Sequence, residues 1–402
     1  MRILANTQLK YLTHAALIQL LLISIIISAC SGSENVELPE RTASLENVSV
    51  LDPNAEPEYL IKFEEIYSVG NREPVLFSRI SEVEADDRGY LYAAESFSGQ
   101  ETVYVFDREG TPVTTLGRNG AGPGEFRSIF SLSHGAGFIY VLDYNLQRFQ
   151  GFSTESFEPV VISDLTSSQW DISGENTAVF PHRIEAYGDD SLLGIFNYLT
   201  FETDKLLLYR IDQSGSVSSE RLADLDYIRH LRDPVESGRA YYDPFGGRGL
   251  ISVSDDGRIF YNWSEDFLIR VMDRDGNDLY AFYYPVEKAQ LESTEALNFY
   301  GTGPSVESFQ RTIRSDGIPD YWRAIEHMVV DGENRIWVSV ITDDPETYDW
   351  WVMDDRGQPL SKFTWPRSRV VQEVKNGTLY TIETDEETGV QEVVAYRISL
   401  ES

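Results

Sequence analysis

Short apolar runs joined by tight polar turns recur along the chain and predict β-hairpins. In four places an apolar run leads directly into the pattern Asp-x-x-Gly. These turns are Asp107 to Gly110, Asp212 to Gly215, Asp273 to Gly276 and Asp354 to Gly357. Aspartate can open such a turn by accepting hydrogen bonds from nearby backbone, and glycine tolerates the positive φ that closes it. Each pattern therefore marks the end of one strand and the start of the next.

A second pattern, a polar turn that feeds an apolar strand, lies upstream of the hairpins. Its copies are Asp87 to Tyr92, Ala136 to Val141, Asp190 to Leu193, Asp256 to Phe260, Glu333 to Val338 and Asn376 to Tyr380. Six copies, each within a unit of four short strands, are typical of a six-bladed β-propeller. We expect this all-β propeller to occupy residues 58–402.

The spacing of the units predicts two inserts and a closed ring. Longer intervals near 225–247 and 288–321 interrupt the repeats, and acidic residues among apolar ones predict a short helix in the second. An apolar run from Tyr59 to Tyr67 has no blade of its own, and Val393 to Ile398 is the last strand of the pattern. We expect these two strands to share one blade, because their pairing closes the ring and removes exposed sheet edges.

The first 29 residues predict a secretory signal peptide. They carry Arg2 and Lys10 as their charges, then an apolar stretch, then small residues just before Cys30. The sequence from Ile27 to Cys30 resembles a bacterial lipobox, which implies cleavage before Cys30 and acylation of its thiol and of the new amino terminus. Two or more acyl chains hold a protein stably at a bilayer. The alternative is a membrane-spanning anchor, but the apolar stretch is shorter than the ~20 residues that a spanning helix needs.

Composition places the protein outside the cytoplasmic and nucleic-acid-binding classes. Residues 30–57 are polar and show no period, so we expect a flexible tether behind the lipidated Cys30. The formal net charge of −33 repels nucleic acid. Because Cys30 is the one cysteine in the sequence, no internal disulfide, Cys-based metal cluster or catalytic thiol can form. We expect a lipid-anchored protein of the cell envelope, at the outer membrane.

One unit also resembles a known repeat. The sequence Leu116-Gly117-x-x-Gly120-x-Gly122-Pro123-Gly124-Glu125-Phe126, followed by Ile139-Tyr140-Val141-x-Asp143-x-Asn145-x-x-Arg148-Phe149-x-x-Phe152, resembles an NHL repeat. The chain is likewise similar to bacterial six-bladed propeller lipoproteins. This resemblance implies a six-bladed propeller, and it brings in an alternative activity, because similar propellers include metal-dependent lactonases and NHL-type lyases.

An arginine precedes the second pattern in every unit, where the innermost strand of a blade would begin. These residues are Arg79, Arg127, Arg183, Arg248, Arg323 and Arg369, with Arg367 as the alternative to the last. Guanidinium groups bind carboxylate, sulfate or phosphate in bidentate fashion, so a ring of them predicts an anionic ligand at the channel mouth. Alternatively, each arginine pairs with an acidic residue of the next blade and holds the ring together. Side chains alternate along a strand, so some of the six would point away from the channel.

Aromatic residues near the same mouth would suit stacking on a sugar ring. They are Trp170, Tyr241, Tyr242, Phe245, Tyr321 and Trp322, most of them in the inserts. The histidines are scattered without metal-ligand spacing, so we expect no bound metal or cofactor. Calcium stays an alternative that no motif localises, because the acidic run from Asp273 to Asp278 is better explained by its hairpin turn.

The sequence therefore favours a binding module over an enzyme. We expect a small anionic or carbohydrate ligand, or a protein partner of the envelope, with membrane attachment through the lipid and no nucleic acid. The alternative is a metal-dependent lactonase-like enzyme or an NHL-type lyase or hydrolase with its site in the channel, where Glu82, Glu185, Glu326 and His327 lie on innermost strands. A role in envelope assembly is the third hypothesis.

Overall fold

A computed structural model describes residues 38–96, 99–165, 179–188, 191–200, 202–212, 214–299, 301 and 305–402. The signal segment 1–29 and Cys30 lie outside these residues. The chain divides into two units, Met1–Ser44 and Leu45–Ser402, and the described part of the first contains a short 3-10 helix, η1 (Glu40–Thr42). Within the described residues, no helix is long and apolar enough to span a bilayer.

The Asp-x-x-Gly turns form the predicted hairpins. At the first, an Oδ1 of Asp107 accepts hydrogen bonds from the backbone N–H groups of Glu109 (3.1 Å) and Thr111 (2.7 Å). Gly110 closes the turn at φ 78°, a conformation that suits glycine. Asp212, Asp273 and Asp354 accept equivalent bonds, so all four turns are explained by local hydrogen bonding.

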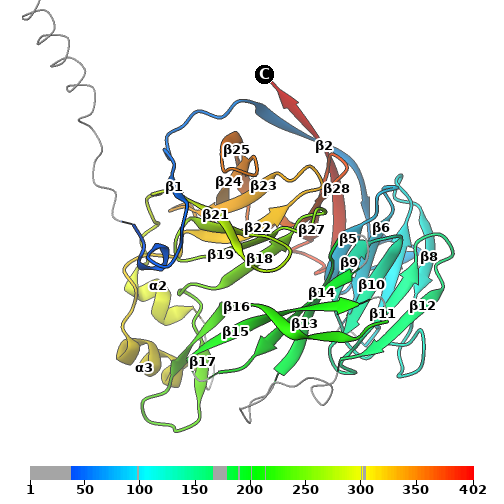
Figure 1. Cartoon of the computed structure of the whole chain (residues 1–402), viewed down its shortest axis with the longest axis horizontal. Helices are drawn as coiled ribbons and strands as arrows, with labels where there is room; N and C mark the ends of the chain where they lie inside the picture. Colours follow the sequence, from blue (N-terminus) through cyan, green and yellow to red (C-terminus); the bar gives the residue numbers. More distant parts are fainter. Residues whose placement is uncertain are drawn as a thin grey trace, which may run out of the picture. The chain divides into compact units, whose positions relative to one another are not determined.

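Six sheets, the blades, follow one another along the chain (Figure 1). In each blade the strands are given from the innermost outward. Blade 1 consists of β5 (Ile80–Ala85), β6 (Leu91–Glu95), β7 (Thr102–Phe106) and β8 (Pro112–Leu116), and blade 2 of β9 (Ile129–Gly135), β10 (Phe138–Asp143), β11 (Arg148–Ser153) and β12 (Pro159–Asp164). Blade 3 consists of β13 (Val179–Ala186), β14 (Ser191–Tyr198), β15 (Thr203–Asp212), β16 (Val217–Arg232) and β17 (Ala240–Tyr242). Blades 4 and 5 are formed by β18 (Gly249–Val253), β19 (Ile259–Trp263), β20 (Leu268–Met272) and β21 (Asp278–Tyr283), and by β22 (Ile325–Val330), β23 (Ile336–Ile341), β24 (Thr347–Met353) and β25 (Pro359–Pro366). The architecture confirms the prediction of an all-β, six-bladed propeller.

The sixth blade joins both ends of the propeller. It consists of β26 (Val370–Lys375), β27 (Thr378–Thr384), β28 (Gln391–Glu401) and, outermost, β2 (Leu60–Val69), which pairs antiparallel with β28. The predicted sharing of one blade by the first and last strands is therefore confirmed. A short hairpin of β3 (Asn71–Arg72) and β4 (Val75–Leu76) leads from β2 towards blade 1.

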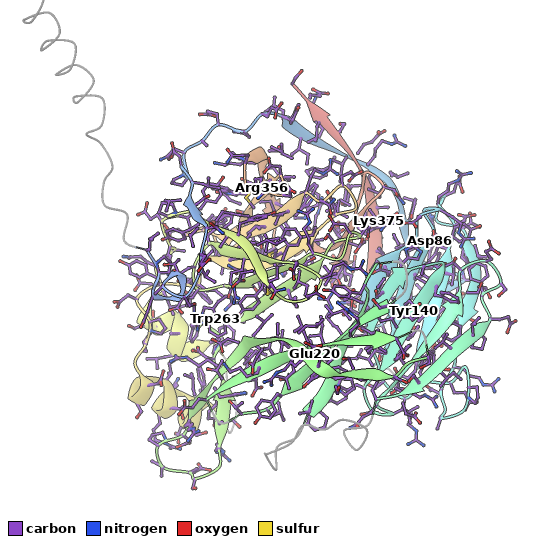
Figure 2. The ribbon with its side chains drawn as sticks, in the orientation of Figure 1. Asp86, Tyr140, Glu220, Trp263, Arg356 and Lys375 are labelled. Atoms are coloured by element: carbon purple, nitrogen blue, oxygen red, sulfur yellow. The ribbon has the colours of Figure 1, made fainter. Side chains whose placement is uncertain are left out.

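Each blade packs both of its faces against neighbouring blades, so the core consists of six clusters, one between each adjacent pair. Tyr140 and Trp263, labelled in Figure 2, belong to the clusters between blades 2 and 3 and between blades 3 and 4. Because both faces are covered, the second strands are largely buried, and β6 and β23 are buried along their whole length. This explains the continuous apolar runs that the second pattern showed in place of simple alternation.

The two predicted inserts have different structures. The second contains α2 (Ser293–Asn298) and α3 (Val306–Asp316), which confirms the expected helix and adds another. The first is not a separate insert, because the 16-residue strand β16 continues through it and turns back into β17. Leu231, Phe245, Phe309 and Ile313 form a small apolar cluster that joins the two regions.

Part of the expected tether is also ordered in strands. Within the segment 30–57, strand β1 (Val48–Val50) pairs in parallel with β21 at the outer edge of blade 4. Farther on, the backbone carbonyls of Pro53 and Ala55 accept hydrogen bonds from Lys362 at 2.9 and 3.1 Å. Sequence pattern could not show this, because a strand of three residues is too short to display a period.

Candidate functional site

The innermost strands of all six blades surround a channel with two adjoining chambers. The deep chamber has a volume of about 700 Å³ and is lined from every blade, by residues that include Glu82, Ser133, Glu185, Ser252, Met328 and Glu373. The mouth chamber, of about 240 Å³, lies where innermost strands begin and is lined by residues that include Tyr227, Tyr242, Arg248, Glu326 and His327. His182, Arg183, Ile251, Met328 and Val329 line both chambers. The channel can therefore receive a small ligand from the mouth.

A repeated irregularity shapes this channel. In blades 1, 2, 3, 5 and 6, the pairing between innermost and second strand shifts register at an equivalent position. The residues left without a partner in the ladder are Ser81, Phe130, His182, Glu326 and Gln372, and all of them line one of the chambers. A β-bulge of this kind re-aims a side chain. It also changes the parity of the residues that follow, which is why position in sequence did not indicate which side chains face the channel.

Two of the six predicted arginines, Arg183 and Arg248, line the mouth chamber, and Arg323 contacts Glu326 in its wall. Arg248 of blade 4 and Arg323 beside β22 both form ion pairs with Glu326 of blade 5, the first at 2.8 Å. Arg183 lines both chambers and pairs with Glu185 on its own strand. The Nε atoms of Arg248 and Arg323 are buried without a hydrogen-bond acceptor among the described residues. Two guanidinium groups thus share one carboxylate, and part of their donor capacity is unused.

The protonation states at the mouth favour a positive charge. Burial raises the pKa of Glu326, but the charges of Arg323 and Arg248 outweigh this effect and hold it below its ordinary value. Burial lowers the pKa of His327 to about 4 and that of His182 to about 3. Both imidazoles are therefore neutral at pH 7, and Glu326 is ionised. Arg183 is paired with Glu185, and Arg248 and Arg323 share Glu326. Three arginines and two glutamates therefore leave one positive charge in excess.

The other three arginines do not complete a ring. Arg79 is exposed and lines the deep chamber, whereas Arg127 is exposed and lines neither chamber. Arg369 pairs with Glu383 of its own blade at 3.3 Å. The six arginines therefore lie in different surroundings, and Arg248 pairs with Glu326 of the next blade. Of the aromatic candidates, Tyr242 lines the mouth chamber, and Trp170 lies outside the described residues.

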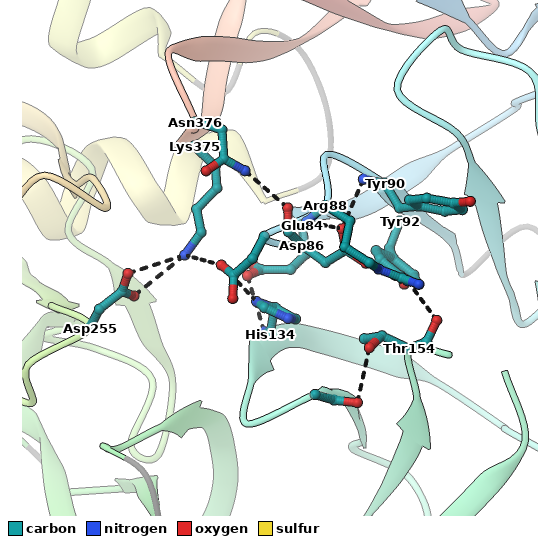
Figure 3. Close-up of polar contacts among 12 residues, drawn as sticks. Glu84, Asp86, Arg88, Tyr90, Tyr92, His134, Thr154, Asp255, Lys375 and Asn376 are labelled. Carbon is teal, nitrogen blue, oxygen red and sulfur yellow. Dashed lines mark hydrogen bonds and ion pairs between the residues drawn. The ribbon is translucent and has the colours of Figure 1, made fainter. Parts of the chain in front are cut away.

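Other polar groups hold the blades together. Arg88 donates to the carbonyl of Thr154 in blade 2 at 2.6 Å, and Arg274 donates from blade 4 to the carbonyl of Tyr187 in blade 3 at 2.9 Å. Asn376 of blade 6 donates to the carbonyl of Asp86 in blade 1 at 3.1 Å (Figure 3). These residues lie at turns outside the arginine pattern, and no feature of the pattern singled them out.

The deep chamber is acidic. Glu82, Glu84, Glu185 and Glu373 project from innermost strands of blades 1, 3 and 6, and all four line it. Burial raises the pKa of Glu82 to about 7, in spite of the nearby Arg183. Burial likewise raises the pKa values of Glu84 and Glu373, and the mutual repulsion of carboxylates in the chamber adds to it. The chamber therefore holds carboxyl groups that are partly protonated at neutral pH.

Lys375 lies at the far end of this chamber. Its Nζ approaches Asp255 at 3.3 Å (Figure 3) and Asp87 at 3.5 Å. These contacts connect blades 6, 4 and 1 across the channel. An Oε1 of Glu84 accepts a hydrogen bond from the backbone N–H of His134 at 3.0 Å. Burial opposes the charge of Lys375, but Asp255, Glu373 and Asp87 raise its pKa above the ordinary value. Lys375 is therefore fully charged and already neutralised by its neighbours.

Comparisons with known proteins agree with this architecture. Residues 69–218 match the sequence profile of a family, DUF5128, that is described as a 6-bladed beta-propeller. No curated protein matches the sequence significantly. The fold is a six-bladed β-propeller.

Two solved structures share this propeller at low sequence identity. A protein of Bacteroides fragilis NCTC 9343 that carries the provisional description of an exported protein superposes with a TM-score of 0.51 at 12% identity, over 89% of this chain and 100% of that one. A member of the duf4221 family from Bacteroides vulgatus superposes with a TM-score of 0.53 at 12% identity, over 85% of this chain and 99% of that one. At such identities the likeness shows the fold alone.

The candidate residues of the enzyme hypothesis separate into two pairs in this propeller. Glu82 and Glu185 line the deep chamber, whereas Glu326 and His327 line the mouth chamber. Among the described residues, no group of three or more His, Cys, Asp or Glu side chains is arranged to hold a metal ion. Asp273, of the acidic run considered for calcium, accepts the hydrogen bonds of its hairpin turn.

Proposed function

We propose that this protein is an exported, lipid-anchored binding module whose propeller takes up a small anionic ligand at the mouth of its channel. The observation that carries the proposal is the shared use of Glu326 by Arg248 and Arg323, beside a chamber of about 240 Å³. One carboxylate cannot neutralise two guanidinium groups. A second carboxylate, or a sulfate or phosphate, held in the mouth chamber beside Arg248 would balance the charge.

The walls of the mouth chamber suit a ring-shaped ligand. The rings of His182 and Tyr227 lie 4.9 Å apart, and Tyr242 of the β17 hairpin lines the same space. Aromatic faces of this kind pack against the apolar face of a sugar or against another aromatic ring. A sugar acid combines both features and is the ligand class that we would test first.

Binding can be measured by titration calorimetry and thermal unfolding with glucuronate, sulfate and phosphate, with glucose as the neutral reference. We expect the anions to raise the unfolding temperature and glucose to do so less. Arg248→Gln removes a charged donor at the mouth and should weaken anion binding about tenfold or more, since hydrogen bonds to charged groups contribute about 1.5–3 kcal/mol. Arg127→Gln is the matched control, because Arg127 is exposed and lines neither chamber.

Two results would contradict the proposal. The first is wild-type protein that binds none of the anions at millimolar concentration. The second is an equal loss of binding in Arg248→Gln and Arg127→Gln, which would indicate general electrostatic attraction in place of a site at the mouth.

A further inference from the structure

We infer that the deep chamber is a second recognition site, which binds an organic ammonium group, and that the ligand of the channel is zwitterionic. The ammonium site stands on the geometry of the deep chamber alone. Its combination with an anionic group in one molecule rests on the function proposed above.

The charge of the chamber wall is unbalanced. Six acidic side chains line the deep chamber, against three basic ones, Arg79, Arg183 and Lys375. Arg183 pairs with Glu185, and Lys375 lies between Asp87 and Asp255. Arg183 lies near Glu82, and Lys375 lies near Glu84 and Glu373, but none of these three carboxyls forms an ion pair with a described residue.

Two of these carboxyl groups also lack hydrogen bonds. Glu84 accepts from the backbone of His134, but Glu82 and Glu373 have neither a hydrogen bond nor an ion pair with any described residue. Both are half-buried and line the chamber, so their remaining exposure is to its interior. Carboxyl groups that are partly removed from water without partners are costly, and a ligand that donates to them would reduce that cost.

The groups that face these carboxyls come from several blades. Arg183 and Glu185 of blade 3 face Glu82, and Lys375, Glu185, Asp255 and Arg183 face Glu373. Burial and this acidic surrounding raise the pKa values of both carboxyls, so a cation that enters the chamber would favour their ionised forms. Binding of an ammonium group near pH 7 should therefore release protons.

The chamber suits an ammonium group better than a metal ion. A tightly bound divalent ion needs several oxygen ligands at short distances, and no described group of three acidic or histidine side chains meets that arrangement. An ammonium group has three donors and is satisfied by one or two carboxylates. Ile251, Met328 and Val329 line both chambers, beside His182 and Arg183, and give the passage between them an apolar side. A ligand with an anionic head, an alkyl spacer and a terminal amine would match the mouth, the passage and the deep chamber in turn.

Three probes with the same carbon skeleton separate these contributions. Hexylamine carries the ammonium group, hexanoate carries the anion, and 6-aminohexanoate carries both. Titration calorimetry at pH 7, in two buffers with different ionisation enthalpies, would measure affinity and proton release together. We expect 6-aminohexanoate to bind at least about tenfold more tightly than either single-ended probe. We also expect hexylamine and 6-aminohexanoate, but not hexanoate, to release protons.

Isosteric variants identify the site. Glu82→Gln and Glu373→Gln should each weaken hexylamine binding about tenfold and reduce its proton release, while leaving hexanoate binding unchanged. Glu220→Gln is the matched control, since Glu220 is exposed on β16 (Figure 2). Thermal unfolding of each variant without ligand checks that it folds.

The possible failures are distinguishable. If hexylamine binds with no dependence on Glu82 or Glu373, or does not bind at all, the ammonium site is wrong whatever hexanoate does. If hexylamine binds as expected but hexanoate does not, the anion site at the mouth is wrong and the ammonium site stands. If both bind but 6-aminohexanoate gains nothing over either, two sites exist and the zwitterionic ligand is rejected.

Discussion

The carboxyl groups of the channel illustrate how burial and local charge oppose each other at single residues. Glu326 and Glu82 are both glutamates in poorly hydrated surroundings, yet the pKa of Glu326 is lowered and that of Glu82 is raised. Glu326 lies between two guanidinium groups, whereas the positive charge near Glu82 is engaged by Glu185. The mouth therefore stabilises a negative charge at Glu326, whereas in the deep chamber acidic side chains outnumber basic ones.

The raised pKa of Glu82 predicts how stability depends on pH. Its pKa rises from 4.5 in the unfolded chain to about 7 in the folded protein, so the folded state binds the proton more tightly. The stabilisation from this proton is complete below pH 4.5 and is lost as pH rises to about 7. It amounts to at most about 3 kcal/mol. We expect Glu82→Gln to flatten the loss of unfolding free energy between pH 5 and 8, measured by denaturant titration.

The same titration on Glu220→Gln, in which an exposed carboxyl is replaced, should follow the wild-type curve. A Glu82→Gln protein whose stability falls with pH as steeply as the wild type would show that Glu82 is ionised in the folded state throughout.

At the level of single site residues, sequence predicted less than it did for the fold. The arginine pattern found Arg183, Arg248 and Arg323, because guanidinium groups do gather where innermost strands begin. It also selected Arg127 and Arg369, since sequence does not show where a bulge changes which residues face the channel. Glu373 carried no signal at all. Its significance comes from Glu82, Glu84 and Glu185, which lie far from it in sequence and meet it only across the closed channel.

At the scale of elements, the strands and turns were largely predictable because their signals are local. An Asp-x-x-Gly turn contains its own hydrogen bonds, so four residues suffice to identify it. β1 and the continuation of β16 into β17 depend on pairing with distant partners and therefore left no local signal. The pairing of β2 with β28 was predictable because the first strand has no blade of its own and the last blade has only three strands. Pairing the two completes that blade and covers both edges.

Removal of successive segments before blade 1 should affect stability unequally. A chain that begins at Leu45 keeps β1 and should unfold as the full-length body does. A chain that begins at residue 58 loses the pairing of β1 with β21 and the acceptors of Lys362, and its unfolding temperature should fall by a few degrees. A chain that begins at residue 70 loses β2, which leaves β28 as an exposed edge and removes Phe63 from its contacts with Phe363 and Trp365.

We expect the shortest of these chains to aggregate, because an unpaired edge strand recruits other chains. Thermal unfolding followed by circular dichroism, together with size-exclusion chromatography, would measure the series. Cooperative unfolding of the chain that begins at residue 70 would show that closure by β2 is dispensable.

For the whole molecule, the acidic surface and the lipid anchor proposed at Cys30 have separate consequences. A net charge of −33 disfavours contact with anionic headgroups, so the propeller has no electrostatic attraction to a membrane surface. Retention at the membrane must then come from the acyl chains proposed at Cys30. A rigid channel on such an anchor would stay in the envelope while small ligands enter and leave its mouth.

The variant Cys30→Ser tests directly whether acyl chains hold the protein at the membrane. In a bacterial host with lipoprotein processing, we expect the wild-type protein to sediment with membranes, to resist washing with high salt, and to partition into the detergent phase of a Triton X-114 separation. The variant lacks the thiol that is acylated and should move to the aqueous phase, with its propeller folded, because no described residue of the propeller depends on Cys30. If the variant instead stays with the membranes and is released by salt, a charged protein partner holds the propeller there. If it stays through the salt wash and enters the detergent phase, the apolar stretch before Cys30 acts as an uncleaved anchor.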